Sequence, residues 1–184
     1  MPNRSTTLLC AASFLLLGAC SPPEIHQPIG ATLQVRSTTI ADGIIPDKCG
    51  CKGPGISPEV EWSDPPAGTK SIAIIMDDQA ISGHLHRKHF VHWVAFDLKP
   101  DRRQFAEGAS QSLNAGELAG KNDVGQFGYS GPCPDAGTTH HYTISVYALD
   151  STLGLPTATN GRQLMTAIDG HILARGTLVG AYTH

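Results

Sequence analysis

The sequence predicts an antiparallel β-sandwich that carries one helix late in the chain. Many segments are short, rich in β-branched residues and separated by turn residues, as at 65–68. Only one later stretch has the periodicity of an amphipathic helix. Strands followed by a single late helix differ from the alternating strands and helices of a parallel sheet. We therefore expect one mainly β domain, since 184 residues suffice to bury one core.

Residues 1–19 have the layout of a secretory signal and are set apart from the fold. Arg4 precedes an apolar run at 7–17, which is shorter than the roughly 20 residues of a transmembrane helix. The run ends in Leu-Gly-Ala before Cys20, and this resembles the lipobox of bacterial lipoproteins. We expect an exported protein, acylated at Cys20, anchored in the outer membrane and facing the periplasm. An ordinary secretory signal is the alternative.

Residues 20–30 then form a lipidated cysteine and a Pro-rich tether, because three prolines in 21–28 favour an extended chain. The domain occupies residues 31–184. Without Arg4 the chain carries 12 Lys and Arg against 16 Asp and Glu, a net charge of −4. It has no long basic run, so we expect no nucleic-acid partner.

Three strands are expected at the centre of the fold. Residues 71–76 and 90–96 are apolar on both faces apart from His92, which predicts strands covered on both sides. Residues 140–149 alternate in character, and this predicts a strand with two different faces. One of its faces carries His140, Tyr142, Ile144, Val146 and Ala148.

The one predicted helix covers residues 161–175. Apolar residues recur there every four positions from Leu164 to Ile172, which places them on one face. Asn160 precedes this stretch and is a suitable N-cap. Residues 177–182 are expected to return to a strand.

Three cysteines lie beyond Cys20, at positions 49, 51 and 133. In an exported protein, one disulfide and one free thiol is the simplest arrangement. Cys49 and Cys51 are two positions apart, and a bridge between them would be strained. The disulfide is therefore expected to join this segment to Cys133, with its partner left open between the two.

Four histidines lie close together at positions 84, 86, 89 and 92. They lead into a strand, where helical spacing does not apply, and no H-E-x-x-H motif is present. We therefore expect loop histidines at 84, 86 and 89, and no metal or cofactor. His92 differs because an unpaired ring inside an apolar strand costs about 1–3 kcal/mol, so it needs a partner. Taken alone, a hydrogen-bonded core histidine is the ordinary interpretation.

Residues 128–137 are rich in glycine and contain Ser130. The stretch departs from a nucleophile elbow, because Gly131 follows the serine directly and no helix follows the turn. We therefore do not expect a serine hydrolase, and we expect no enzymatic activity. Glycines leave backbone N–H groups open to an anion, although a plain turn has the same composition.

Three stretches share their order and spacing with one protein family. They are Asp77-Asp78-Gln79-Ala80, the pair His92-Trp93, and residues 120–142. Together with residues 56–62 and 66–71, they resemble the phosphatidylethanolamine-binding protein family and its bacterial Raf kinase inhibitor-like branch. The similarity runs from about residue 43 to residue 182.

This resemblance implies a Greek-key β-sandwich with a large central sheet, a smaller sheet and a C-terminal helix. It implies a pocket for phosphate or a phospholipid head group, and it gives a hint of homodimerisation. The matching ligand-binding positions are Asp77, His92, Gly131, His140 and Tyr142. Asp77 would orient and charge His92, because a nearby carboxylate favours the protonated ring. The resemblance also selects Cys51, and not Cys49, as the disulfide partner of Cys133.

The chain departs from the family's DPDAP motif at three positions. Asp78 and Ile81 replace its prolines, and Gln79 replaces its second aspartate, so the motif does not specify which head group is recognised. The main hypothesis is a lipid-anchored protein that binds an anionic small ligand. The alternative is an interaction or inhibitor protein that contacts a protein target through residues 82–89. A metal-dependent or serine hydrolase is the least expected.

Overall fold

The computed structural model describes residues 31–78 and 90–184. The predicted leader at 1–19, the acylated Cys20 with the whole tether up to residue 30, and the contact loop at 82–89 lie outside these ranges. Among the described residues, no helix has both the length and the apolar character needed to cross a membrane.

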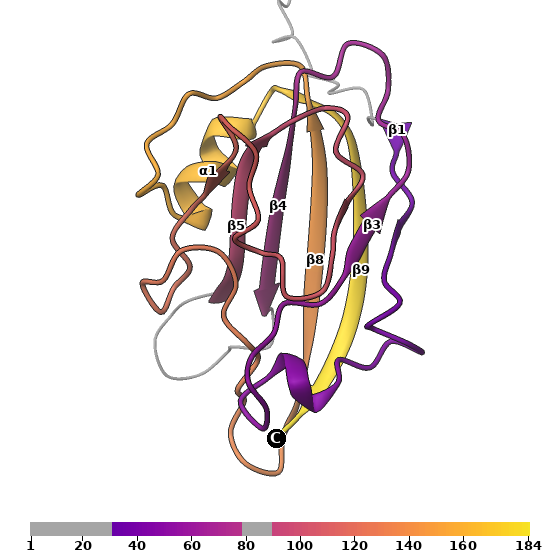
Figure 1. Cartoon of the computed structure of the whole chain (residues 1–184), viewed down its shortest axis with the longest axis vertical. Helices are drawn as coiled ribbons and strands as arrows, with labels where there is room; N and C mark the ends of the chain where they lie inside the picture. The colour runs from indigo at the N-terminus through magenta and orange to yellow at the C-terminus, as the bar shows by residue number, and fades with distance from the viewer. Residues whose placement is uncertain (1–30, 79–89) are drawn as a thin grey trace, which may run out of the picture.

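Two sheets form a β-sandwich (Figure 1), and nearly all of their strand pairs are antiparallel. The larger sheet has the order β1-β9-β8-β4-β5-β7, and its β1–β9 pair is parallel. Its strands are β1 (Ala31–Thr32), β9 (Ile172–Thr183), β8 (Thr139–Leu149), β4 (Ser71–Asp78), β5 (Phe90–Leu98) and β7 (Leu118–Ala119). The smaller sheet consists of β2 (Val35–Arg36), β3 (Val60–Trp62) and β6 (Gln104–Phe105). A 3-10 turn, η1 (Asp47–Cys49), and one helix, α1 (Gly161–Ile168), complete the described elements. The predicted sandwich is confirmed.

Apolar side chains cover both faces of the central strands. On one face, every second β4 residue from Ile72 to Met76 packs in one core cluster with Trp62 and Phe105 of the smaller sheet. On the other face, Leu164 of α1 packs against the large sheet, and Figure 1 shows the helix beside β5. Burial on both sides explains why these strands read as continuous apolar runs.

The helix begins where the sequence predicts. The side chain of Asn160 accepts a hydrogen bond from Gln163 N at 3.0 Å, and Gln163 Oε1 accepts one from Asn160 N at 3.0 Å. This reciprocal pair is a capping box, and it satisfies two amide groups at the start of the helix.

The helix ends earlier than predicted, so the expected helix over 161–175 is wrong in its second half. Gly170 has a φ of 81°, a left-handed conformation that ends a helix readily in glycine. Ile172 then pairs with Leu149 and starts β9. The apolar spacing that predicts a helix to Arg175 instead reflects Ile172 packing beside α1 from the sheet.

The disulfide joins Cys51 to Cys133, with their Cα atoms 5.2 Å apart. Cys49 is the free cysteine of the described chain; it is fully buried, and burial raises the pKa of its thiol to about 11. A buried thiol with a raised pKa is unreactive. The backbone carbonyl of Cys49 accepts a hydrogen bond from Tyr129 Oη at 2.8 Å. Cys49 is therefore part of the hydrophobic core.

Candidate functional site

The candidate site begins with an irregularity where β4 pairs with β5. Met76 lies opposite Trp93, but the next β4 residue lies opposite Val91, so His92 is an extra residue in β5. Such β-bulges re-aim a side chain and are frequent beside functional sites. His92 is 6% exposed, and its ring meets the ring of Tyr142 edge to face, with their centroids 5.2 Å apart.

The strand β8 supplies a second histidine on the same face. The rings of His140 and Tyr142 stack with centroids 6.4 Å apart, as expected for residues two positions apart on a strand. Tyr142 is buried between the two imidazoles. Burial, with a further contribution from the carboxylate of Asp78, raises the pKa of Tyr142, so its hydroxyl stays protonated. The structure therefore brings together His92, His140 and Tyr142, as the resemblance implies.

A buried carboxylate holds His140 in place. Asp78 Oδ2 lies 2.6 Å from His140 Nδ1, and the side chain of Asp78 is 3% exposed, against 23% for His140. A buried carboxylate is stable only when it is paired and hydrogen-bonded. The pair directs the other ring nitrogen, Nε2, away from Asp78.

The aspartate beside His140 is Asp78, where the sequence analysis chose Asp77 for the site. Asp78 lies opposite Tyr142 in the β4–β8 ladder, whereas Asp77 lies opposite Thr143. Neighbouring strand residues point to opposite faces, so Asp77 and Asp78 diverge. The charge of Asp77 also affects the pKa of His92 less than that of Asp78 does. Ligand binding by Asp77 stays a prediction.

The sequence contained a signal for Asp78. In β4 every second residue from Ile72 to Met76 lies in the core between the sheets. Asp78 is the next position in this series, so the two-residue period of the strand places it on the same face as Tyr142.

The hydrogen-bond partner of His92 is a backbone carbonyl. His92 Nδ1 lies 3.0 Å from Ser130 O, and Ser130 N donates to His92 O at 2.8 Å. A carbonyl can only accept, so Nδ1 carries the proton and Nε2 of the neutral ring carries a lone pair. Burial lowers the pKa of His92, and this outweighs the opposite effects of Ser130 and of nearby carboxylates. The expectation that a carboxylate keeps His92 charged is therefore wrong for the free protein at neutral pH.

The loop before β8 approaches the site through Ser130 and Gly131. An added Cβ at Gly131 would lie 2.6 Å from Cys49 O, so only glycine fits this close approach. The hydroxyl oxygen of Ser130 is buried and has no hydrogen-bond partner among the described residues. Contact between Gly131 and an anion stays a prediction.

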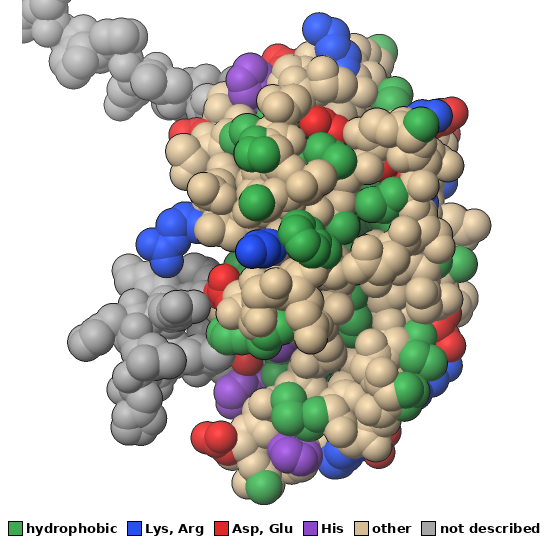
Figure 2. All heavy atoms as spheres, turned by 60° about the vertical axis from the view of Figure 1, so that its left-hand side comes forward, with side chains coloured by type: hydrophobic (Ala, Val, Ile, Leu, Met, Phe, Trp, Pro, Cys, Tyr) green, Lys and Arg blue, Asp and Glu red, His purple; other side chains and the backbone are tan. Residues whose placement is uncertain are grey.

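Histidine and acidic side chains gather in the lower part of the face shown in Figure 2. Within the described ranges, one group of three side chains meets the geometry of a metal site, and it consists of Cys51, Cys133 and His184. Two of these form the disulfide. His92 and His140 belong to no such group. Their ring nitrogens and the hydroxyl of Tyr142 are suited to hydrogen bonding.

Known proteins resemble this chain over most of its length. A family model described as phosphatidylethanolamine-binding protein matches residues 36–183. A UPF0098 protein of Methanothermobacter thermautotrophicus is 37% identical over 142 residues, which cover 76% of this chain and 91% of that protein. LppC of Mycobacterium tuberculosis, which is named as a candidate lipoprotein, is 36% identical over 157 residues and covers 84% of this chain and 74% of its own.

Two crystal structures share the fold. A phosphatidylethanolamine-binding protein homologue from Chlamydia trachomatis has a TM-score of 0.74 and 35% identity, over 84% of this chain and 99% of its own. Escherichia coli YbcL has a TM-score of 0.75 and 25% identity, over the same shares of the two chains. The disulfide and the name of LppC hint at export. The chain belongs to the phosphatidylethanolamine-binding protein family.

Proposed function

We propose that this protein binds a small anionic ligand, of the phosphate or phospholipid head-group type, and catalyses no reaction on it. The observation that carries the proposal is the convergence of His92, His140 and Tyr142 from two strands, with Asp78 behind them. Family membership supports anion binding in general terms.

The two histidines would serve an anion in different ways. His140 is held by the carboxylate of Asp78 at 2.6 Å, which leaves Nε2 as the ring atom available to a ligand. An ionised partner shortens and strengthens such hydrogen bonds. His92 is neutral in the free protein, and its Nε2 becomes a donor only on gaining a proton. An arriving anion favours the protonated ring, so ligand binding would draw a proton onto His92.

We propose in addition that acylation at Cys20 anchors the protein in the outer membrane, facing the periplasm. The likeness to LppC supports export of this kind. An anchored head-group binder would lie close to its ligands. Labelling of cells with an alkyne fatty acid, compared between the natural chain and Cys20→Ala, tests the anchor. Equal labelling of the two chains would exclude acylation at this cysteine.

Isothermal titration calorimetry with phosphate, phosphoethanolamine and phosphocholine tests the ligand site. His140→Gln removes the imidazole that Asp78 orients and should weaken binding at least tenfold, as loss of a charge-assisted hydrogen bond of about 1.5–3 kcal/mol implies. His171→Gln is the matched control, because His171 also pairs with a carboxylate, that of Asp150 at 2.8 Å, but on another part of the surface. Equal weakening by both variants would contradict a specific site.

The same titration separates this function from the alternative of protein interaction. A chain shortened within residues 82–89 should retain phosphate binding if His92 and His140 hold the anion. Capture of a protein target that depends on this segment, but not on His140, would favour an interaction module.

A further inference from the structure

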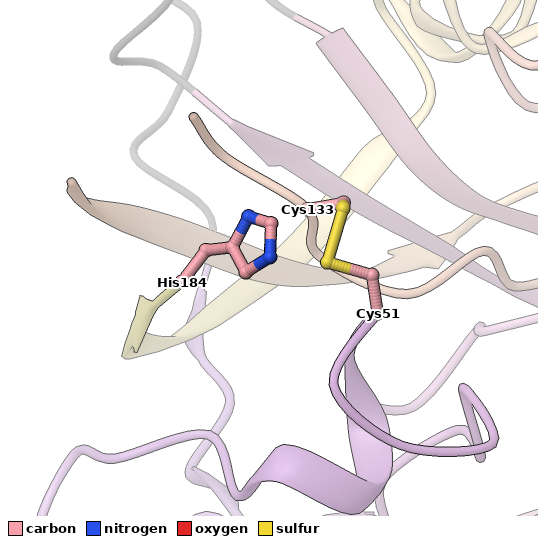
Figure 3. A group of neighbouring side chains, drawn as sticks. All are labelled: Cys51, Cys133 and His184. Atoms are coloured by element: carbon pink, nitrogen blue, oxygen red, sulfur yellow. A yellow bond between two sulfur atoms is a disulfide. The ribbon is translucent and has the colours of Figure 1, made fainter. Parts of the chain in front are cut away.

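A second cluster of side chains, none of which belongs to the candidate set of His92, His140 and Tyr142, lies where the loop before β8 meets the end of β9. Ligand atoms of Cys51, Cys133 and His184 lie within 4.8 Å of one another. Figure 3 shows the ring of His184 facing the disulfide, with one nitrogen turned toward the sulfur atoms. Both cysteines are exposed and His184 is half-buried, so solutes can reach the group.

Backbone contacts hold the two cysteine segments together independently of the bridge. Cys51 N donates to Pro132 O at 2.9 Å, which joins the segment after η1 to the residue before Cys133. Lys52 N donates to Tyr182 Oη at 3.0 Å, which ties the same segment to β9. Reduction of the disulfide therefore leaves both thiols close to their present positions.

His184 is held at both its backbone and its ring. His184 N donates to Thr138 O at 3.1 Å, and His184 O accepts from Gly137 N at 2.6 Å. His184 Nδ1 lies 2.7 Å from Pro134 O, a carbonyl that can only accept. The proton is thus on Nδ1, and Nε2 carries a lone pair. Metal-binding histidines show the same arrangement, in which a carbonyl fixes the tautomer of the ligating ring.

We propose that Cys51, Cys133 and His184 bind a zinc ion when the disulfide is reduced. A dithiol reductant transfers two electrons and two protons, which converts the disulfide into two thiols and the reductant into its own disulfide. Zinc then replaces the two thiol protons, which are released to solvent, and Nε2 of His184 becomes the third ligand. Two thiolates and one imidazole are a ligand set that zinc prefers.

The geometry suits this ion. Zinc lies about 2.3 Å from sulfur and about 2.0 Å from nitrogen, so tetrahedral ligation needs sulfur atoms about 3.8 Å apart and sulfur–nitrogen distances of about 3.5 Å. Ligand atoms already within 4.8 Å need only small side-chain rotations, and the two Cα atoms are 5.2 Å apart. The fourth position would be open to water, as in three-ligand zinc sites. The buried Cys49 is not part of this set.

The test uses the full chain. Its disulfide is reduced by a phosphine in the absence of oxygen, and the phosphine is then removed. Zinc is titrated by calorimetry, and cobalt is added separately because thiolate ligation gives it a characteristic charge-transfer absorption. The expected result is one metal ion per reduced chain and none per oxidised chain. His184→Ala should weaken zinc binding by about 100-fold or more, since loss of even an outer partner costs 10–100-fold. Cys49→Ala and His171→Ala are controls that should bind normally.

Three results would overturn the proposal. One is absence of stoichiometric metal in the reduced chain. A second is equal affinity in His184→Ala, or loss of binding in Cys49→Ala. The third concerns folding, which near-ultraviolet circular dichroism follows before and after zinc is added. If the reduced chain loses its near-ultraviolet circular dichroism signal and does not regain that signal when zinc is added, the proposed zinc site does not exist.

Discussion

Replacing Cys51 and Cys133 by serine tests how much of the stability depends on the bridge between the η1 segment and the loop before β8. The two residues are 82 positions apart in sequence. The chain-entropy relation gives a loss of about 4.5 kcal/mol in the free energy of unfolding for a loop of this length. The native state changes little, because the hydrogen bond from Cys51 N to Pro132 O remains at 2.9 Å.

Urea unfolding of the double variant measures this loss. In a separate thermal unfolding experiment, the midpoint temperature should fall by about 9–18 °C, at roughly 2–4 °C per kcal/mol for a domain of this size. Reduction of the natural chain, measured in metal-free buffer, should give the same loss. A double variant within about 1 kcal/mol of the natural chain would refute the entropic reasoning.

Three further changes probe individual contacts. Arg102→Ala should cost about 3–5 kcal/mol in urea unfolding at pH 7, because it leaves the fully buried carboxylate of Glu117 without its 2.5 Å partner. Despite burial, hydrogen bonds from Arg102 and from backbone amides lower the pKa of Glu117 to about 2, so this contribution is present above pH 4.5 and lost toward pH 2. Burial lowers the pKa of His92 from 6.5, so the free energy of unfolding should decrease as the pH drops below 6.5. Urea unfolding at several pH values measures this decrease, and the contribution of His92 to it should be absent in His92→Gln. Gly131→Ala would place a Cβ 2.6 Å from Cys49 O and should cost about 1–3 kcal/mol by thermal unfolding; an unchanged midpoint would contradict the close approach.

The parts of the fold that depend on local pattern were predictable from the sequence. The alternation at 140–149 places Tyr142 in the core and His140 on the same face, as β8 confirms. The cap at Asn160 follows from its side chain and from the stretch that it precedes. The early end of α1 was not predicted, because Ile172 continues the helical spacing while its backbone pairs with Leu149.

The site itself depends on how strands pair, and this limits prediction from one sequence. The bulge at His92 exists only as a mismatch between β4 and β5, so neither strand shows it alone. The low pKa of His92 likewise depends on burial by residues distant in sequence. The two-residue period of β4 could have identified Asp78 as the aspartate beside His140. The sequence analysis chose Asp77 instead, because Asp77 matches the first aspartate of the family's DPDAP motif. The residues alone left Cys49 and Cys51 equivalent, and the family resemblance decided for Cys51.

Histidine NMR during titration with phosphoethanolamine, at pH values on both sides of 6.5, tests the central claim most directly. The account predicts saturable shifts at His92 and His140, proton uptake by His92 as the ligand binds, and tighter binding as the pH falls. His171, which is paired with Asp150 on the surface, should not follow the same saturation curve. Unchanged signals from His92 and His140 in millimolar ligand would contradict an anion site between these strands.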